Sequence, residues 1–254
     1  MIAQAATEST PLLTYAVCVT GLAPLAWLVW RHRAGRPVLA TASPAAFAPA
    51  KPMVLGLIAL GYFLFYGLTG AAVLTDDLSP AAAIGGALGT LSVGLVLYGV
   101  VVRRLFRPQG RPTERLRRGI LVLWAAMPVV FGAFLLLQWV GLEGAQKSVT
   151  WLADRRHGWQ VVALHAVVVA PVAEETCFRG LLYPALRQLR GPRYAILLTA
   201  VIFGLVHVLP AVAFPMVLFG AAMAWLCETN GSFLPCLLAH IAFNGLTVLQ
   251  LLLV

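Results

Sequence analysis

The sequence predicts an all-α protein, a polytopic bundle of about eight transmembrane helices. Its 254 residues are 61% hydrophobic and only 11% charged, and the mean hydropathy is +0.89. Soluble globular chains carry about 25% charged residues, which excludes a soluble domain of this length. Apolar stretches close to the ~20 residues of a membrane-spanning helix recur along the whole chain, and arginines gather in the connections between them. These three observations indicate an integral, multi-pass membrane protein.

Eight apolar stretches are expected to be helical, each with its ends defined to within a few residues. They cover residues 11–30, 53–75, 81–102, 120–140, 159–186, 193–209, 211–227 and 233–254. The sixth and seventh are short for a span, and the fifth is long enough to tilt or to project beyond the hydrocarbon. The chain shows no internal repeat. We therefore expect residues 1–150, with four spans and no motif, and residues 151–254, with the other four spans, to form one membrane unit.

The charges of the connections predict how the bundle is oriented. Basic stretches at residues 31–36, 103–118 and 187–193 follow the first, third and fifth predicted spans, whereas the opposite connections carry Glu8, Asp76 and Asp77. Basic connections stay on the cytoplasmic side, so both termini are expected on the other side. This explains the net charge of +9 without nucleic acid, which we do not expect as a partner. A composition rich in Ala, Arg and Gly is typical of a high-GC bacterium, so we expect the bacterial inner membrane.

Polar residues at membrane depth are concentrated in the last four predicted spans. They are Glu174, Glu175, Arg179, His207, His240 and Asn244, together with His165. A charged side chain at the bilayer centre costs about 2.5–3.5 kcal/mol on insertion scales, so such residues usually serve a function. At ~1.5 Å per residue, Glu174, His207, His240 and Asn244 lie roughly 10–21 Å from the predicted cytoplasmic ends of the three helices that carry them. The first four spans carry almost none, and the chemistry is therefore expected in the C-terminal half.

Helical spacing divides these residues into two groups. Glu175 and Arg179 are four residues apart with the acid first, which predicts an ion pair. Glu174 is turned about 100° from Glu175, and we expect it to face a cavity together with His207 and the pair His240 and Asn244. His165 lies nine residues before Glu174, on roughly the opposite face, and is expected to make a local hydrogen bond. Polar residues can also simply join helices through hydrogen bonds, which is the structural alternative.

Three motifs in the C-terminal half resemble the signatures of a known family. They are Glu174-Glu175-x-x-x-Arg179, Phe203-x-x-x-His207 and His240-x-x-x-Asn244, and the resemblance covers roughly residues 159–250. The family is the CAAX-protease and bacteriocin-processing family, also called the ABI domain family, which comprises intramembrane proteases related to the Rce1-type prenyl-protein endopeptidase. The resemblance implies hydrolysis of a peptide bond near the membrane-associated or C-terminal part of a protein or peptide substrate.

By motif position, the resemblance implies that Glu174 and His207 activate the water, that His240 and Asn244 stabilise the oxyanion, and that Glu175, Arg179 and Phe203 support the site. A desolvated carboxylate is a stronger base than one in water, and donors held in a dry cavity stabilise an oxyanion strongly. The alternative is a zinc enzyme in which Glu174, His207 and His240 hold Zn²⁺ with a water in the fourth position. The chain lacks the HExxH motif of many zinc proteases, so we favour the glutamate-type mechanism and no metal cofactor.

Two other classes of function stay open at this stage. A non-enzymatic membrane protein for bacteriocin self-immunity would keep the same helices without using their chemistry. An ion-coupled transporter would also place carboxylates and imidazoles at mid-membrane, although transporters often show inverted repeats that are not seen here. The expected partners are the lipid bilayer and a membrane-anchored protein or peptide substrate, and the sequence does not predict an oligomeric state.

Overall fold

The structure is a computed structural model that describes residues 11–36, 46–73, 79–142, 144, 147–154 and 158–253. Every regular element among these residues is helical, and the helices occupy all eight predicted spans. Glu8, Asp76 and Asp77, on which part of the predicted orientation depends, lie outside the described residues.

The first four predicted spans form the N-terminal helices. They are α2 (Pro11–Arg33), α3 (Pro52–Val73), a helix made of α4 (Pro80–Leu97), η2 (Tyr98–Val102) and α5 (Arg103–Leu105), and α6 (Pro112–Trp139). α6 begins eight residues before the predicted span because the helix continues through charged residues that hydropathy does not detect. Its first turn is closed by Glu114, whose carboxylate accepts a hydrogen bond from the backbone N–H of Arg111 at 3.3 Å.

The last four predicted spans form the C-terminal helices. The fifth is a continuous helix of 32 residues, Trp159–Arg190, which is roughly 45 Å long and exceeds the ~30 Å hydrocarbon, as predicted. It consists of α8 (Trp159–Leu164), η3 (His165–Val169), α9 (Ala170–Glu175), η4 (Thr176–Leu182) and α10 (Tyr183–Arg190). It is followed by α11 (Pro192–Leu205), α12 (Pro210–Asn230) and α13 (Leu234–Leu252).

Prolines determine where helices begin and where the long helix widens into π-helical turns. Among the described residues that have a described residue before them, five helices, α3, α4, α6, α11 and α12, begin at a proline, which suits a position whose N–H would have no partner within the helix. Within the long helix, η3 ends two residues before Pro171 and η4 ends two residues before Pro184. A proline ring clashes with the carbonyl four residues earlier, and the extra residue of a π-turn relieves that contact.

Six helices among the described residues are long and apolar enough to cross a membrane. α11 has 14 residues and is shorter, in agreement with the short sixth span that the sequence predicts. α2 is helical over 23 residues but is not among the six. The protein is therefore an integral, multi-pass membrane protein built as an α-helical bundle.

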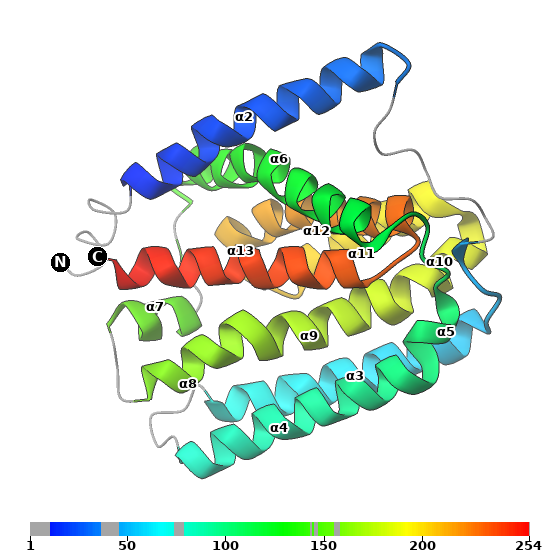
Figure 1. Cartoon of the computed structure of the whole chain (residues 1–254). Coiled ribbons are helices and arrows are strands. Elements are labelled where there is room, and N and C mark those ends of the chain that lie inside the picture. The colour runs from blue at the N-terminus through cyan, green and yellow to red at the C-terminus, as the bar shows by residue number, and fades with distance from the viewer. Residues whose placement is uncertain are drawn as a thin grey trace.

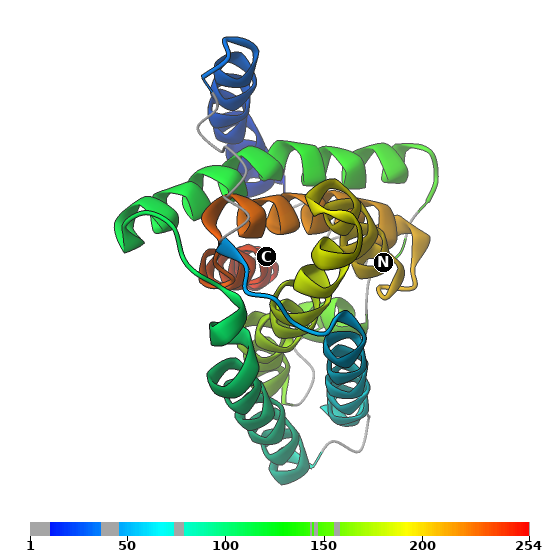
Figure 2. The same ribbon diagram turned by 90° about the vertical axis from the view of Figure 1, so that its right-hand side faces the viewer.

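The three basic stretches gather at one end of the bundle. The C-terminus of α2, the N-terminus of α6 and the junction between α10 and α11 all lie at that end (Figure 1). The N-terminus of α2 and the C-terminus of α13 lie at the opposite end. Figure 2 looks onto the basic end. This arrangement is compatible with the predicted orientation, and the assignment of the basic end to the cytoplasm stays a prediction.

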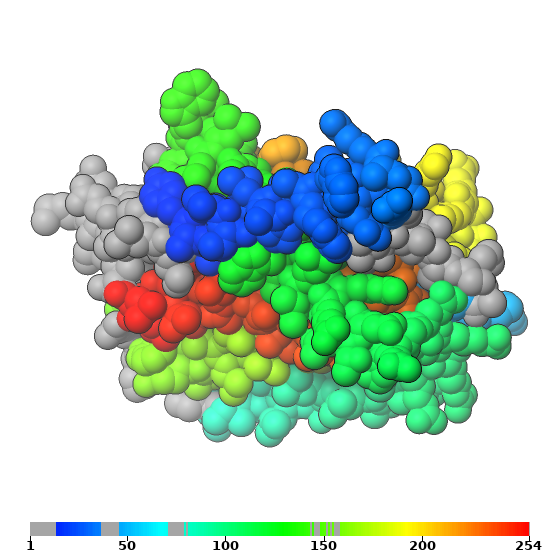
Figure 3. All heavy atoms as spheres, turned by 45° about the horizontal axis from the view of Figure 1, so that its top comes forward, coloured from blue at the N-terminus to red at the C-terminus, as the bar shows by residue number. Residues whose placement is uncertain are grey.

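The C-terminal helices are more buried than α3 and α4. The most apolar stretches of the helix Trp159–Arg190, of α12 and of α13 are 50%, 56% and 39% buried, against 17% for α3 and 11% for the helix that contains α4. α2 lies across α6 at the surface, as the space-filling view shows (Figure 3). A short helix, α7 (Lys147–Ala153), packs against α8 and α13 in a region where we had predicted only a connection.

A buried ion pair joins α10 to α12 near the basic end. The Arg187 guanidinium donates from Nε and Nη2 to the two carboxylate oxygens of Glu228 at 2.7 and 2.9 Å, and the Tyr183 hydroxyl donates to Glu228 at 2.6 Å. The Arg187 guanidinium also lies 4.2 Å over the ring of Phe47. Arg187 therefore fixes the packing of the bundle in addition to contributing to a basic connection.

Candidate active site

The two adjacent glutamates of the first motif lie at the end of α9, between the π-helical turns η3 and η4. Glu175 is completely buried, whereas the side chain of Glu174 is 15% exposed and lines a cavity. The two carboxylates thus point to different surroundings, as their positions on one helix predict. π-Helical turns occur frequently at functional sites.

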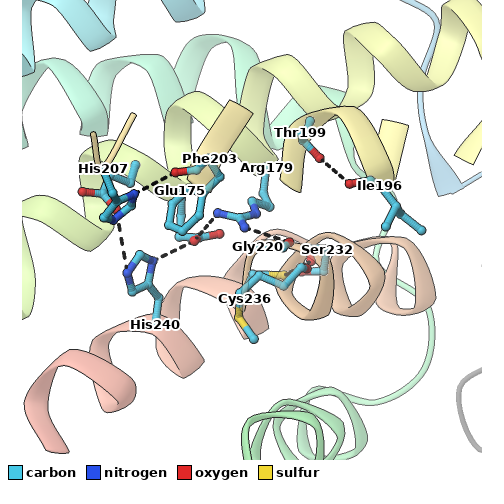
Figure 4. A network of polar contacts seen from close by, with 12 residues as sticks. Glu175, Arg179, Ile196, Thr199, Phe203, His207, Gly220, Ser232, Cys236 and His240 are labelled. Carbon is cyan, nitrogen blue, oxygen red and sulfur yellow. Dashed lines mark hydrogen bonds and ion pairs between the residues drawn. The ribbon is translucent and has the colours of Figure 1, made fainter. Parts of the chain in front are cut away.

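Glu175 and Arg179 form the ion pair that their spacing predicts. Arg179 donates from Nη1 to Oε1 of Glu175 at 2.7 Å and from Nη2 to the carbonyl of Gly220 at 3.0 Å. Both side chains are fully buried, and the guanidinium lies 4.5 Å from the centre of the Phe203 ring. Figure 4 shows this pair beside His240. The pair neutralises two charges that would otherwise be costly to bury.

His240 of α13 connects the two glutamates. Its Nδ1 lies 2.8 Å from Oε1 of Glu175 and its Nε2 lies 3.8 Å from Oε2 of Glu174. An ionised carboxylate only accepts hydrogen bonds, so Nδ1 carries the hydrogen that is shared with Glu175. His240 was predicted to face Glu174, and its bond to Glu175 is an additional contact that fixes the plane of the ring.

His207 is held by the end of its own helix. Its Nδ1 donates to the carbonyl oxygen of Phe203 at 2.7 Å (Figure 4), because a carbonyl can only accept. Nε2 of the neutral ring is therefore an acceptor. The Phe203 ring packs 5.0 Å from the His207 ring and 5.9 Å from the His240 ring. Val208, the residue that follows His207, has a backbone φ of 63°. This is a strained conformation for a β-branched residue.

Asn244 lies one helical turn after His240 on α13. Its Nδ2 donates to the carbonyl of Ala166 at 2.8 Å, which ties α13 to the π-turn η3. One N–H of the amide is used in this bond, so the second N–H and the carbonyl oxygen can face the cavity.

A cavity of about 620 Å³ brings these residues together. Glu174, His207, His240 and Asn244 all line it, whereas Glu175 and Arg179 lie behind it. Most of its wall is apolar and includes the rings of four phenylalanines, Phe63, Phe131, Phe134 and Phe243. It extends toward α7 and the end of α13, where Leu152 and Leu251 line it. A few convergent polar groups in an apolar cavity are typical of a binding or catalytic site.

Two cavity residues differ from the sequence-based predictions. The Tyr66 hydroxyl of α3 donates to Oε1 of Glu174 at 3.3 Å, although the first four spans were expected to contribute no chemistry. His165 was predicted on the face opposite Glu174. This prediction was wrong, because His165 lines the same cavity and its ring stacks on Tyr66, with centroids 5.8 Å apart. The π-turn η3 contains an extra residue per turn and rotates His165 toward Glu174, and Pro171 was the sequence signal for that turn.

The three residues that the zinc alternative requires, Glu174, His207 and His240, line the same cavity. Among the described residues, no group of three His, Cys, Asp or Glu side chains lies close enough together to hold a metal ion. Nε2 of His240 lies 3.8 Å from the Glu174 carboxylate. The Nδ1 atoms of His207 and His240 are bonded to the Phe203 carbonyl and to Glu175, and the second nitrogen of a metal-bound histidine is commonly bonded in the same way. Zinc stays the alternative to the glutamate-type mechanism, with Glu174, His207 and His240 as the residues that would hold it, and we derive no step through a metal.

Comparisons with known proteins agree with the motif resemblance. Residues 156–246 match the family model described as type II CAAX prenyl endopeptidase Rce1-like, a range that includes all three motifs. Searches of the curated proteins and of the solved structures found no match.

Proposed function

We propose that this chain, which carries an Rce1-like domain over residues 156–246, is an intramembrane endopeptidase of the glutamate type. The observation that carries the proposal is the convergence of Glu174, His207, His240 and Asn244 on one cavity inside the bundle. They come from three different helical segments, and the cavity otherwise has mostly apolar walls. Peptide hydrolysis needs an activated water and a stabilised oxyanion, and these four side chains supply groups for both.

Glu174 and His207 are suited to activating the water. Neither Nε2 of His207 nor the carboxylate of Glu174 needs to donate, so a water between them can donate one hydrogen to each. Glu174 takes the proton as the water oxygen bonds to the scissile carbonyl carbon. The same proton then passes to the leaving amine as the C–N bond breaks, which leaves Glu174 ionised again.

His240 and Asn244 are suited to stabilising the oxyanion. Nδ1 of His240 already donates to Glu175, so Nε2 can donate to an oxyanion only if the ring carries both protons. Asn244 contributes its second N–H, and one such donor typically accounts for about 10²–10³ in rate.

The chemistry of the cavity also indicates the class of substrate. Its aromatic and aliphatic walls come mostly from helices that are long and apolar enough to cross a membrane, and a polar peptide would lose its hydration there. We infer a substrate whose apolar residues flank the scissile bond and whose chain is anchored in the same membrane, which we take to be a bacterial inner membrane. The test is cleavage of such anchored peptides by the purified protein in liposomes, with both fragments identified by mass. Proton or ion flux without any fragment would indicate a transporter instead.

Cleavage is expected to persist in the presence of EDTA or 1,10-phenanthroline. The reason is that the proposed mechanism assigns activation of the water to Glu174 and His207, which line the cavity, without a metal. Initial rates are measured before and after exhaustive chelation, with metal content followed by mass spectrometry. Loss of activity that is restored by stoichiometric Zn²⁺ would refute the metal-independent mechanism.

Tyr66→Phe is expected to slow cleavage by about tenfold through kcat, with little change in KM. The variant removes a hydrogen bond to a charged carboxylate, typically about 1.5–3 kcal/mol, and so loosens the orientation of Glu174. Tyr62→Phe is the matched control. Tyr62 is buried on the same helix, but its hydroxyl donates to the carbonyl of Thr90 at 2.8 Å, away from the cavity. Equal rate losses in the two variants would show that Tyr66 only stabilises the fold.

A further inference from the structure

A second cavity of about 430 Å³ lies between α2, α6 and α12, away from the candidate active site. It is lined by one face of each helix. On α2 these residues are Leu25, Leu28, Val29, His32 and Arg33, whose spacing of three and four places them on one side of the helix. The face is apolar for two turns and then ends in two groups that can carry positive charge.

The cavity arises because α2 touches α6 closely at one point and then departs from it. A Cβ at Gly21 would lie 2.5 Å from the carbonyl oxygen of Trp124 and 2.7 Å from Cδ of Pro128. Beside this contact the Trp124 indole N–H donates to the hydroxyl of Thr20 at 3.2 Å. Toward the basic end α2 separates from the body of the bundle (Figures 1 and 2).

The other walls of the cavity are apolar and partly open to the outside of the bundle. α6 contributes residues such as Val122 and Val129, and α12 contributes Leu218, Ala222 and Trp225. Val29 and Val129 remain 45% and 41% exposed. The medium outside a membrane-spanning helix is lipid, so an acyl chain is the apolar occupant that has direct access.

The dimensions and the charges of the cavity match one lipid chain with an anionic headgroup. From Leu25 to Arg33 the helix rises ~12 Å, close to the ~15 Å of one hydrocarbon leaflet. None of the described residues that line the cavity is acidic, and the cationic ones are at the end where the basic stretches gather. Basic residues at that level attract anionic lipid headgroups.

We propose that this cleft binds one acyl chain of an anionic phospholipid, whose phosphate is held by His32 and Arg33. The site does not depend on the protease activity, because none of its lining residues belongs to the three motifs. The bound lipid fills the space between α2 and the bundle and so fixes the position of α2.

The headgroup part of the proposal is tested by native mass spectrometry of the purified full chain. Phosphatidylglycerol and phosphatidylcholine with identical acyl chains are titrated onto delipidated protein. We expect tighter retention of phosphatidylglycerol, and Arg33→Gln is expected to weaken it by about fivefold. Arg36→Gln is the matched control, because it removes the same charge three residues later without touching the cavity. Equal weakening by both variants, or equal retention of the two lipids, would overturn the headgroup assignment.

The acyl-chain part is tested by filling the cleft. Ala222→Phe places a ring in the cavity and is expected to abolish retention of the tightly bound lipid, whereas Ala242→Phe on the exposed side of α13 retains it. Thermal unfolding of both variants in detergent verifies that they are folded. Unchanged lipid retention in folded Ala222→Phe would overturn the proposal. A lipid-independent dimer that dissociates in this variant would assign the cleft to a second copy of the chain instead.

Discussion

Glu174→Gln is expected to reduce peptide cleavage by about 10²–10⁴-fold, the usual contribution of a general base. The amide keeps the size of the side chain and an oxygen that can accept the Tyr66 hydrogen bond. It cannot take a proton from water, so the nucleophile is not formed. Single-turnover rates on an anchored peptide measure the effect on the chemical step directly.

The fold of Glu174→Gln is expected to be intact, because Glu174 lines the cavity and is not part of the buried ion pair. Membrane insertion, helical content and thermal unfolding should therefore equal those of the wild type. Glu114→Gln is the control for a loss of one negative charge, since Glu114 is exposed at the start of α6. A Glu174→Gln variant that cleaves at the wild-type rate would eliminate Glu174 as the base.

Arg179→Met is expected to lower the free energy of unfolding by about 3–5 kcal/mol, the typical cost of removing one partner of a buried ion pair. The Glu175 carboxylate would stay fully buried and would keep only the His240 bond. The carbonyl of Gly220 would also lose its donor. Equilibrium unfolding in detergent measures the change, which is expected to be accompanied by loss of cleavage because His240 moves with Glu175.

A double variant separates the effect of an unpaired buried charge on stability from the effect of the altered side-chain packing. Glu175→Gln combined with Arg179→Met removes both charges and is expected to be more stable than Arg179→Met alone, because no unpaired charge stays buried. Arg118→Met is the matched control. Arg118 is partly buried and donates to the backbone carbonyl of Thr229 at 3.4 Å, a bond typically worth about 1 kcal/mol. A loss in Arg179→Met no larger than in Arg118→Met would show that the ion pair does not stabilise the bundle.

Features that depend on one helix at a time could be predicted from the sequence. Hydropathy located the eight apolar helices but not the short α7. A helix in lipid must satisfy its backbone hydrogen bonds internally and needs ~20 apolar residues to cross the membrane. The Glu175–Arg179 pair followed from their spacing of four residues. The convergence of Glu174, His207, His240 and Asn244 on one cavity was expected from their depths along three helices, and the structure places them there.

Contacts between helices were decided only by the tertiary structure. Tyr66 reaches Glu174 from α3 and Glu228 reaches Arg187 from α12, and no spacing rule relates residues 108 or 41 positions apart. The position of His165 depended on a π-turn that changes the helical phase. The sequence by itself determined which segments are helical and which side chains each one carries, because these follow from local geometry and from the thickness of the membrane. How the helices rotate and pack against each other, and therefore which residues surround Glu174, depends on side chains that are distant in the chain.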